Sequence, residues 1–236
     1  MTIIVRFLFI CFLFISILNI YIVLPYIVTL ILRSRFKSII KRNECIFLTF
    51  DDGPNPDSTP QIVHLLEEFN VKATFFLLGE NAEKYPDIVK SIVDMGHEIG
   101  HHSFWHTHAW KSGPCQTLSD LVRGKNAIEK YCSSQKTLLF RPPYGKLNLF
   151  SLLYILFKRW QLIFWTLDPK DYECKSGEKA ARFVIDNLSN GSVVLLHDGR
   201  RQKNSDPQVT VTAVRLILEY FKKRNVRCAT IGTLFD

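Results

Sequence analysis

Two adjacent aspartates, Asp51 and Asp52, are the best candidates for chemistry in this chain of 236 residues. They follow the apolar run 45–50 and precede the pair Gly53-Pro54, so we expect a strand that ends in two carboxylates and a turn. Successive side chains of a strand point to opposite sides. The two acids are therefore expected to do different jobs, unless Asp-Asp-Gly-Pro is only an ordinary turn.

Histidines about fifty residues further on supply partners for one of these carboxylates. His102 and His106 are four residues apart, a spacing that places two side chains on one side of a helical turn. Together with Asp52 they form the ligand set of a catalytic divalent cation, with positions left for water and substrate. Zinc fits these ligands best, and cobalt and manganese are alternatives. His101 and His108 are alternative ligands by residue type, but they lack the spacing.

Hydrolysis at such a centre also needs a base and an acid. Asp51 lies beside the ligand Asp52 and is free to take a proton from water. His197 is the best candidate for the acid because an imidazole can be cationic near neutral pH, although it could instead cap the end of a strand. Asp171 could hold that imidazole and raise its pKa, and Arg141 could pair with Asp51 and keep it ionised.

The elements that must position these residues alternate along the chain. Short apolar runs predict seven strands, at 45–50, 73–79, 98–102, 138–140, 162–167, 192–197 and 228–231. Helical spacing of apolar residues predicts helices between them, at 59–69, 82–95, 118–131, 147–159, 178–188 and 209–224. The pattern predicts an α/β fold, and the candidate site residues follow the carboxyl ends of the strands, where α/β barrels carry their active sites.

The first 44 residues differ from the rest. Between positions 3 and 32 only Arg6 is charged, and the run 7–32 exceeds the roughly 20 residues that cross a bilayer. No small-residue cleavage site follows it. We therefore expect one uncleaved transmembrane helix in an anchor and basic segment, 1–44, followed by a single domain, 45–236.

The charge distribution bears on partners and location. Residues 1–44 hold six basic side chains and one acidic side chain, so they carry more than half of the net charge of +8. This basic cluster predicts contact with anionic lipid headgroups and no nucleic-acid partner. It would place the domain in the cytoplasm, although long domains can be translocated despite such charges. The side of the membrane is therefore left open.

The six cysteines show no Cys-x-x-Cys spacing, so neither a zinc knuckle nor a redox motif is expected. Five of them lie beyond residue 44. This odd number favours free thiols and a reducing compartment.

Five motifs stand in order along the domain: Thr49-Phe50-Asp51-Asp52-Gly53-Pro54, Ala73-Thr74-Phe75-Phe76, Gly96-His97-Glu98-Ile99-Gly100 running into His102-Ser103-x-x-His106, Arg141-Pro142-Pro143-Tyr144-Gly145, and Leu195-Leu196-His197-Asp198. Together they resemble the motifs of the polysaccharide deacetylases, the NodB-homology family also called carbohydrate esterase family 4. The resemblance spans about residues 45–234. It implies a distorted (β/α) barrel, here of about seven strands, that hydrolyses N-acetyl and sometimes O-acetyl groups on amino sugars.

The resemblance also implies a role for each site residue. By motif position, Asp51 is similar to the general base and His197 to the general acid, while the metal ligands are Asp52, His102 and His106.

The supporting residues follow by the same resemblance. Arg141 matches the arginine that tethers the base, and Asp171 matches the aspartate paired with the acid. The backbone N–H of Tyr144 matches the oxyanion donor, and Leu195 and Tyr172 would line a pocket for the acetate methyl. Two positions depart from the family pattern: His101 stands where asparagine is common, and Tyr172 stands where an Asp-Trp pair is usual.

These observations predict a membrane-anchored, metal-dependent deacetylase of N-acetylated glycans. An outward-facing domain would act on peptidoglycan, a chitin-like chain or another polymer, and a cytoplasmic one on a lipid-linked or oligosaccharide precursor. A non-catalytic glycan-binding module is an alternative, but binding alone requires neither Asp51 nor His197. A metal-dependent hydrolase of a non-sugar amide would share all of these residues.

Overall fold

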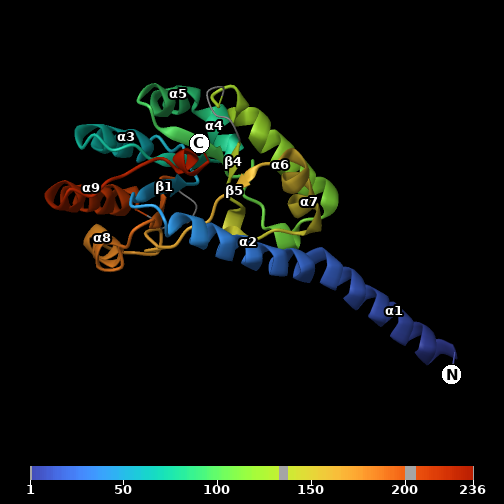
Figure 1. The fold of residues 1–236 in the computed structure, drawn as a ribbon. Helices are drawn as coiled ribbons and strands as arrows, with labels where there is room; N and C mark the ends of the chain where they lie inside the picture. Colours follow the sequence, from blue (N-terminus) through green and yellow to red (C-terminus); the bar gives the residue numbers. More distant parts are fainter. Residues whose placement is uncertain (1, 133–137, 200–205, 236) are drawn as a thin grey trace.

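Six parallel strands form the centre of the fold (Figure 1). The computed structural model describes residues 2–132, 138–199 and 206–235. The strands are β1 (Phe47–Asp51), β2 (Thr74–Leu77), β3 (Glu98–His101), β4 (Leu139–Phe140), β5 (Gln161–Leu162) and β6 (Val193–His197). They are hydrogen-bonded in the order β5-β4-β3-β2-β1-β6. All carboxyl ends therefore lie at one edge of the sheet.

Helices follow the strands and cover the sheet (Figure 1). They are α3 (Thr59–Glu68), α4 (Gly79–Lys84), α5 (Pro86–Asp94), α6 (Pro114–Glu129), α7 (Leu149–Lys158), α8 (Gly177–Asp186) and α9 (Pro207–Arg224). One predicted helix, 82–95, is divided between α4 and α5 because Pro86 cannot continue the helix before it. Several helices begin with proline in the first turn, where the missing N–H costs nothing.

The two faces of the sheet are both buried. Leu48 and Phe50 of β1 lie in the core cluster that packs against the helices. Phe47 lies in a second cluster, with Phe76 and Phe164. Because side chains alternate along a strand, Asp51 shares the second face.

The predicted barrel of about seven strands is wrong in its strand number. Segment 228–231 makes one isolated bridge, between Ile46 and Cys228, and then turns into a 3-10 helix, Ile231–Leu234. The predicted strand 162–167 is also interrupted. Strand β5 ends at Leu162, and further along this segment Leu167 forms an isolated bridge with Val194 of β6. The result is a half-barrel of six strands.

The predicted transmembrane helix is also wrong. The apolar run is divided by a π-helical turn (Asn19–Val23) into α1 (Thr2–Leu18) and α2 (Leu24–Ile40), each of 17 residues. Over residues 2–132, 138–199 and 206–235, no helix has both the length and the apolar character needed to cross a membrane.

Helix α2 packs on the domain, whereas α1 projects away from it (Figure 1). Phe36 and Ile40 of α2 are buried in the cluster that contains Phe47, Phe76 and Phe164. Residues before position 45 therefore contribute to the core, and the boundary between residues 44 and 45 stays a prediction. The six cysteines, all among the described residues, are free thiols.

Truncation of Ile40 tests the packing of α2. Ile40 is 1% exposed, whereas its neighbour Ile39 is 48% exposed. We expect Ile40→Ala to lower the free energy of unfolding by about 2–5 kcal/mol and Ile39→Ala to change it by less than about 0.5 kcal/mol. Chemical denaturation of the full chain measures both. Equal stability of the two variants would contradict the packing of α2 on the domain.

Candidate active site

Asp51 and Asp52 lie where β1 ends. Asp51 is the last residue of the strand and pairs in register with His197 of β6. Asp52 has a φ of 73°, so the strand cannot continue through it. Both residues are buried, at 3% and 5% exposure, which is unusual for the carboxylates of an ordinary turn.

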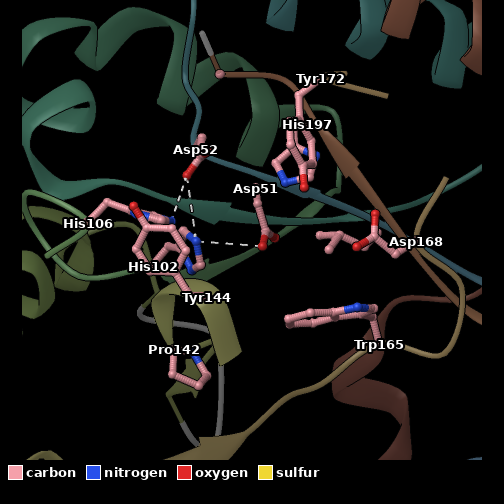
Figure 2. A pocket seen from close by; sticks show the side chains of 12 residues that line it. Asp51, Asp52, His102, His106, Pro142, Tyr144, Trp165, Asp168, Tyr172 and His197 are labelled. Carbon is pink, nitrogen blue, oxygen red and sulfur yellow. Dashed lines mark ion pairs between the residues drawn. The ribbon is translucent and has the colours of Figure 1, made fainter. Parts of the chain in front are cut away.

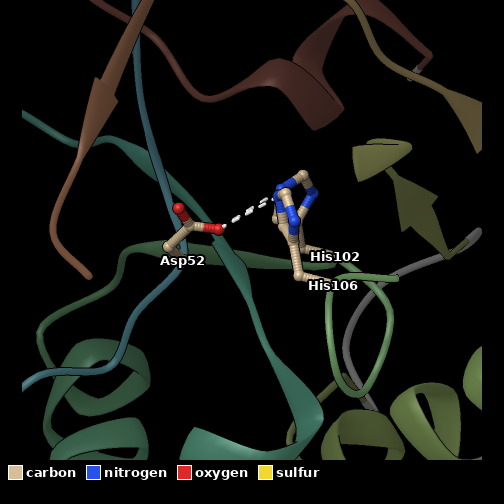
Figure 3. A group of neighbouring side chains, drawn as sticks. All are labelled: Asp52, His102 and His106. Carbon is tan, nitrogen blue, oxygen red and sulfur yellow. Dashed lines mark ion pairs between the residues drawn. The ribbon is translucent and has the colours of Figure 1, made fainter. Parts of the chain in front are cut away.

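Asp52, His102 and His106 form a group that could hold a metal ion (Figure 3). Their ligand atoms all lie within 4.8 Å of one another. Oδ1 of Asp52 is 3.6 Å from Nε2 of His102 and 3.4 Å from Nε2 of His106. Donor atoms bound to zinc at about 2.0–2.2 Å in a tetrahedral site lie about 3.3 Å apart, so the group has the size for such a cation.

The histidines converge through a loop. His102 follows the end of β3, and residues 102–108 are not helical, with positive φ values at Ser103 and His106. The helical turn inferred from the spacing is therefore wrong, although the two rings still meet with centroids 4.8 Å apart. His101 and His108, the alternative ligands, lie outside the group.

Contacts around the group favour cation binding. Nδ1 of His102 lies 2.6 Å from the backbone carbonyl of Arg141, so Nδ1 must carry the proton and Nε2 presents its lone pair to a metal. His101 is turned to other partners, with its ring against Phe140 and Trp160. Burial lowers the pKa of His101 to about 3. Because its ring packs on these partners and lies outside the ligand group, the histidine that stands at position 101 in place of asparagine adds no competing ligand.

Asp120 of α6 shapes the loop that carries the histidines. Its carboxylate accepts backbone N–H groups from Phe104 and Trp105, at 2.9 and 2.7 Å, and the hydroxyl of Thr107. Ser103 supports the same loop, because its Oγ accepts the N–H of His106 at 2.9 Å. A buried acid on a helix therefore holds the metal-ligand loop without touching the ligand atoms.

Arg141 holds the carboxylate of Asp51 in place. Its Nη1 donates to Oδ1 of Asp51 at 2.7 Å and to Oγ1 of Thr49 at 2.8 Å, and its guanidinium stacks on Phe76 at 4.1 Å. Arg141 is fully buried. Burial raises the pKa of Asp51, while the charge of Arg141 and then that of His197 oppose the rise.

Asp171 holds His197 in the same manner. Its Oδ1 lies 2.8 Å from Nδ1 of His197, and its Oδ2 accepts the backbone N–H of His197 and the hydroxyl of Thr210. Burial alone would lower the pKa of His197, but Asp171, followed by Asp52 and Asp51, raises it to about 10. The imidazole is therefore cationic at neutral pH.

The two aspartates Asp51 and Asp52 and the three histidines His102, His106 and His197 line one cavity of about 290 Å³ (Figure 2). Besides Asp51, Asp52 and the three histidines, its walls are formed by Pro142, Tyr144, Trp165, Asp168, Tyr172, Leu195 and Gly199. Tyr144 has a φ of 58° within a 3-10 turn (Pro143–Gly145), and its side chain is exposed at the mouth. The Tyr172 ring lies edge-on to His197 at 4.8 Å. Leu195 and Tyr172 thus both line this cavity.

Asp198 fixes the strand end behind the cavity. Its buried Oδ2 accepts the hydroxyl of Thr59 at 2.6 Å, and its backbone N–H donates to the carbonyl of Asp51. Burial raises the pKa of Asp198 to about 7. The next residue, Gly199, has no room for a side chain, because a Cβ there would lie 2.2 Å from the Asp52 carbonyl oxygen.

The structure brings the ten predicted site residues together around this cavity. Eight of them line it, and Arg141 and Asp171 lie behind it as partners of Asp51 and His197. The roles assigned to these residues stay predictions. The sequence analysis missed Asp120 and Trp165, for which the only signal was a polar or aromatic residue next to an apolar run, and it assigned no role to Asp198 of the last motif.

Comparison with known proteins gives a consistent family. The family model for polysaccharide deacetylase matches residues 39–154. A peptidoglycan-N-acetylglucosamine deacetylase of Bacillus cereus is 36% identical over 198 residues, covering 83% of this chain and 90% of that protein. A chitooligosaccharide deacetylase of Azorhizobium caulinodans is 32% identical, covering 68% of this chain and 77% of that protein.

A solved structure agrees with these relatives. The crystal structure of the Bc1960 peptidoglycan N-acetylglucosamine deacetylase superimposes with a TM-score of 0.75 at 31% identity, covering 82% of this chain and 89% of that chain. The likeness therefore extends over most of the domain.

Replacement of Asp52 tests the metal group. Asp52→Asn removes the one charged ligand, so we expect zinc affinity to fall by more than about a hundredfold. Competition with a chromophoric chelator measures it. Asp168→Asn is the control, since Asp168 lines the same cavity but lies outside the ligand group. Zinc binding at full strength by Asp52→Asn would refute the assignment.

Proposed function

Because the chain belongs to the polysaccharide deacetylase family, we propose that it removes N-acetyl groups from the amino sugars of a glycan with the help of a bound divalent cation. It is an enzyme of the polysaccharide deacetylase type, a hydrolase of non-peptide carbon–nitrogen bonds in linear amides. The relatives named as peptidoglycan and chitooligosaccharide deacetylases support N-acetylglucosamine chains as the substrate class.

One observation carries the proposal: Asp51 and His197 lie at the ends of neighbouring strands beside the metal-ligand group. Each is held by a buried partner of opposite charge, Asp51 by Arg141 and His197 by Asp171. A carboxylate and a cationic imidazole across one cavity are a base and an acid. A glycan-binding module would need neither of these buried pairs.

Asp52, His102 and His106 would hold the cation, with zinc as the first choice for two imidazoles and one carboxylate. When bound, such a cation supplies Lewis acidity, which polarises the acetyl carbonyl and makes a water molecule more acidic. Oδ1 of Asp51 is engaged by Arg141, which leaves Oδ2, 3.6 Å from Nε2 of His102, to accept the proton of the attacking water.

His197 completes the hydrolysis. Its Nδ1 is held by Asp171, so Nε2 carries the proton that the sugar nitrogen receives as the carbon–nitrogen bond breaks. The backbone N–H of Tyr144 would donate to the oxygen that becomes negative when water adds to the carbonyl. The acetyl methyl would rest against Leu195 and Tyr172. The products are acetate and a free amino sugar.

Replacement of Asp51 distinguishes the role of a general base from that of a metal ligand. Asp51→Asn should lower kcat for acetate release from N-acetylglucosamine oligomers by about a hundredfold to ten-thousandfold while zinc affinity stays within a few fold. Acetate release by enzyme-coupled assay and zinc titration together measure this. Full turnover by the variant would rule out Asp51 as the base.

Replacement of Asp171 tests the acid through pH. Asp171 raises the pKa of His197 to about 10 against the opposing effect of burial, so Asp171→Asn should lower that pKa. The alkaline limb of kcat/KM, set by loss of the acid proton, should then move to lower pH. The control is Glu173→Gln, an exposed acid nearby. An unmoved alkaline limb in Asp171→Asn would exclude His197 as the acid.

A further inference from the structure

Helix α2 reaches the wall of the cavity through Arg33. The guanidinium carbon of Arg33 lies 4.8 Å from the ring centroid of Trp165 and 5.2 Å from that of Phe164. Trp165 lines the cavity, and Figure 2 shows its ring beside Asp168. Arg33 does not line the cavity itself. It therefore contacts residues that form the wall and does not face the cavity.

The same guanidinium also packs under the turn that carries Tyr144. Gly145 has a φ of +63°, and a Cβ on it would lie 3.0 Å from Nη2 of Arg33 and 3.0 Å from Cη2 of Trp165. Arg33 and Trp165 thus meet at the backbone of Gly145, the residue after Tyr144. One side chain from α2 touches both Trp165 and the turn at the cavity mouth.

The rings are the main partners of this charge. Among the described residues no ion pair joins Arg33 to a carboxylate, and its Nε is buried without a hydrogen-bond partner. Burial lowers the pKa of Arg33. Within the described part of the chain this half-buried guanidinium is therefore stabilised chiefly by the two aromatic faces, so its removal would free the Trp165 ring to move.

Two further contacts join the N-terminal helices to loops beside the site. The Tyr26 ring lies edge-on to Trp110 at 5.8 Å. The hydroxyl of Tyr21 donates to the carbonyl of Ser112 at 2.7 Å and accepts from Asn148 at 3.0 Å. All of these helix residues precede position 39, where the match to the family model begins.

We propose that Arg33 is a positioning residue that fixes the Trp165 wall, and that α2 thereby helps to set substrate affinity. The inference rests on the proposed function for the identity of the substrate. Arg33 takes no part in the chemistry. Its loss should therefore affect KM more than kcat.

The test compares Arg33→Gln with Arg35→Gln in the full chain, because Arg35 is an exposed arginine on the same helix. Arg33→Gln should raise KM for N-acetylglucosamine oligomers by about threefold to tenfold, with kcat within about twofold. It should also shift the fluorescence of Trp165, taken as the difference from the matching Trp165→Phe protein. Arg35→Gln should change neither.

Arg33→Lys keeps the charge but loses the planar stack, so it should restore less than half of the lost affinity. An unchanged KM in Arg33→Gln overturns the inference, as does an equal rise in KM in Arg35→Gln. If the unaltered protein released no acetate from any glycan, the proposed function would fail. In that case the fluorescence decides the inference, and unchanged Trp165 emission in Arg33→Gln overturns it.

Discussion

A charged side chain that is completely buried must be paired, and Arg141 imposes this constraint on the site. Leaving such a charge without its partner costs several kcal/mol, about 3–5 when one member of a buried pair is removed. Arg141 meets the constraint with Asp51, Thr49 and the face of Phe76. Its own carbonyl meanwhile orients His102. One residue thus fixes both the candidate base and a candidate metal ligand.

A second buried ion pair lies on the His197 side of the cavity, with the charges exchanged relative to the Arg141–Asp51 pair. There the buried group is the carboxylate of Asp171, and the group that it holds is the imidazole of His197. Because β1 and β6 are neighbours in register, Asp51 and His197 emerge side by side. Asp120 and Asp198 hold the loops on either side through backbone N–H and hydroxyl groups. Buried acids therefore position the residues of the candidate site.

Local pattern predicted the strands that matter most for the site. The strand before Asp51 and the strand before His197 are apolar runs that end in polar residues, and both exist as β1 and β6. The local sequence pattern could not show which segments pair as strands of the sheet. Segment 228–231 was therefore predicted as a strand, although it forms only one bridge, between Cys228 and Ile46. Nor could hydrophobicity show that a π-helical turn, Asn19–Val23, divides the apolar run.

The site itself was predictable where residue type alone limits the choice. Two imidazoles and a carboxylate indicate a metal, whatever backbone carries them. The spacing of His102 and His106 selected two rings that do meet, but the expected helical turn was wrong, since positive φ values in a loop bring them together. Asp120, Asp198 and Trp165 were assigned no role from the sequence because their contacts are with residues distant along the chain.

The most direct test of the account is a crystal structure of the zinc-loaded protein. The account predicts zinc within about 2.0–2.2 Å of one oxygen of Asp52 and of Nε2 of His102 and His106. Asp51 should remain on Arg141, away from the metal. Zinc bound by Asp51 or by His101 in place of these ligands would contradict the division between ligand and base.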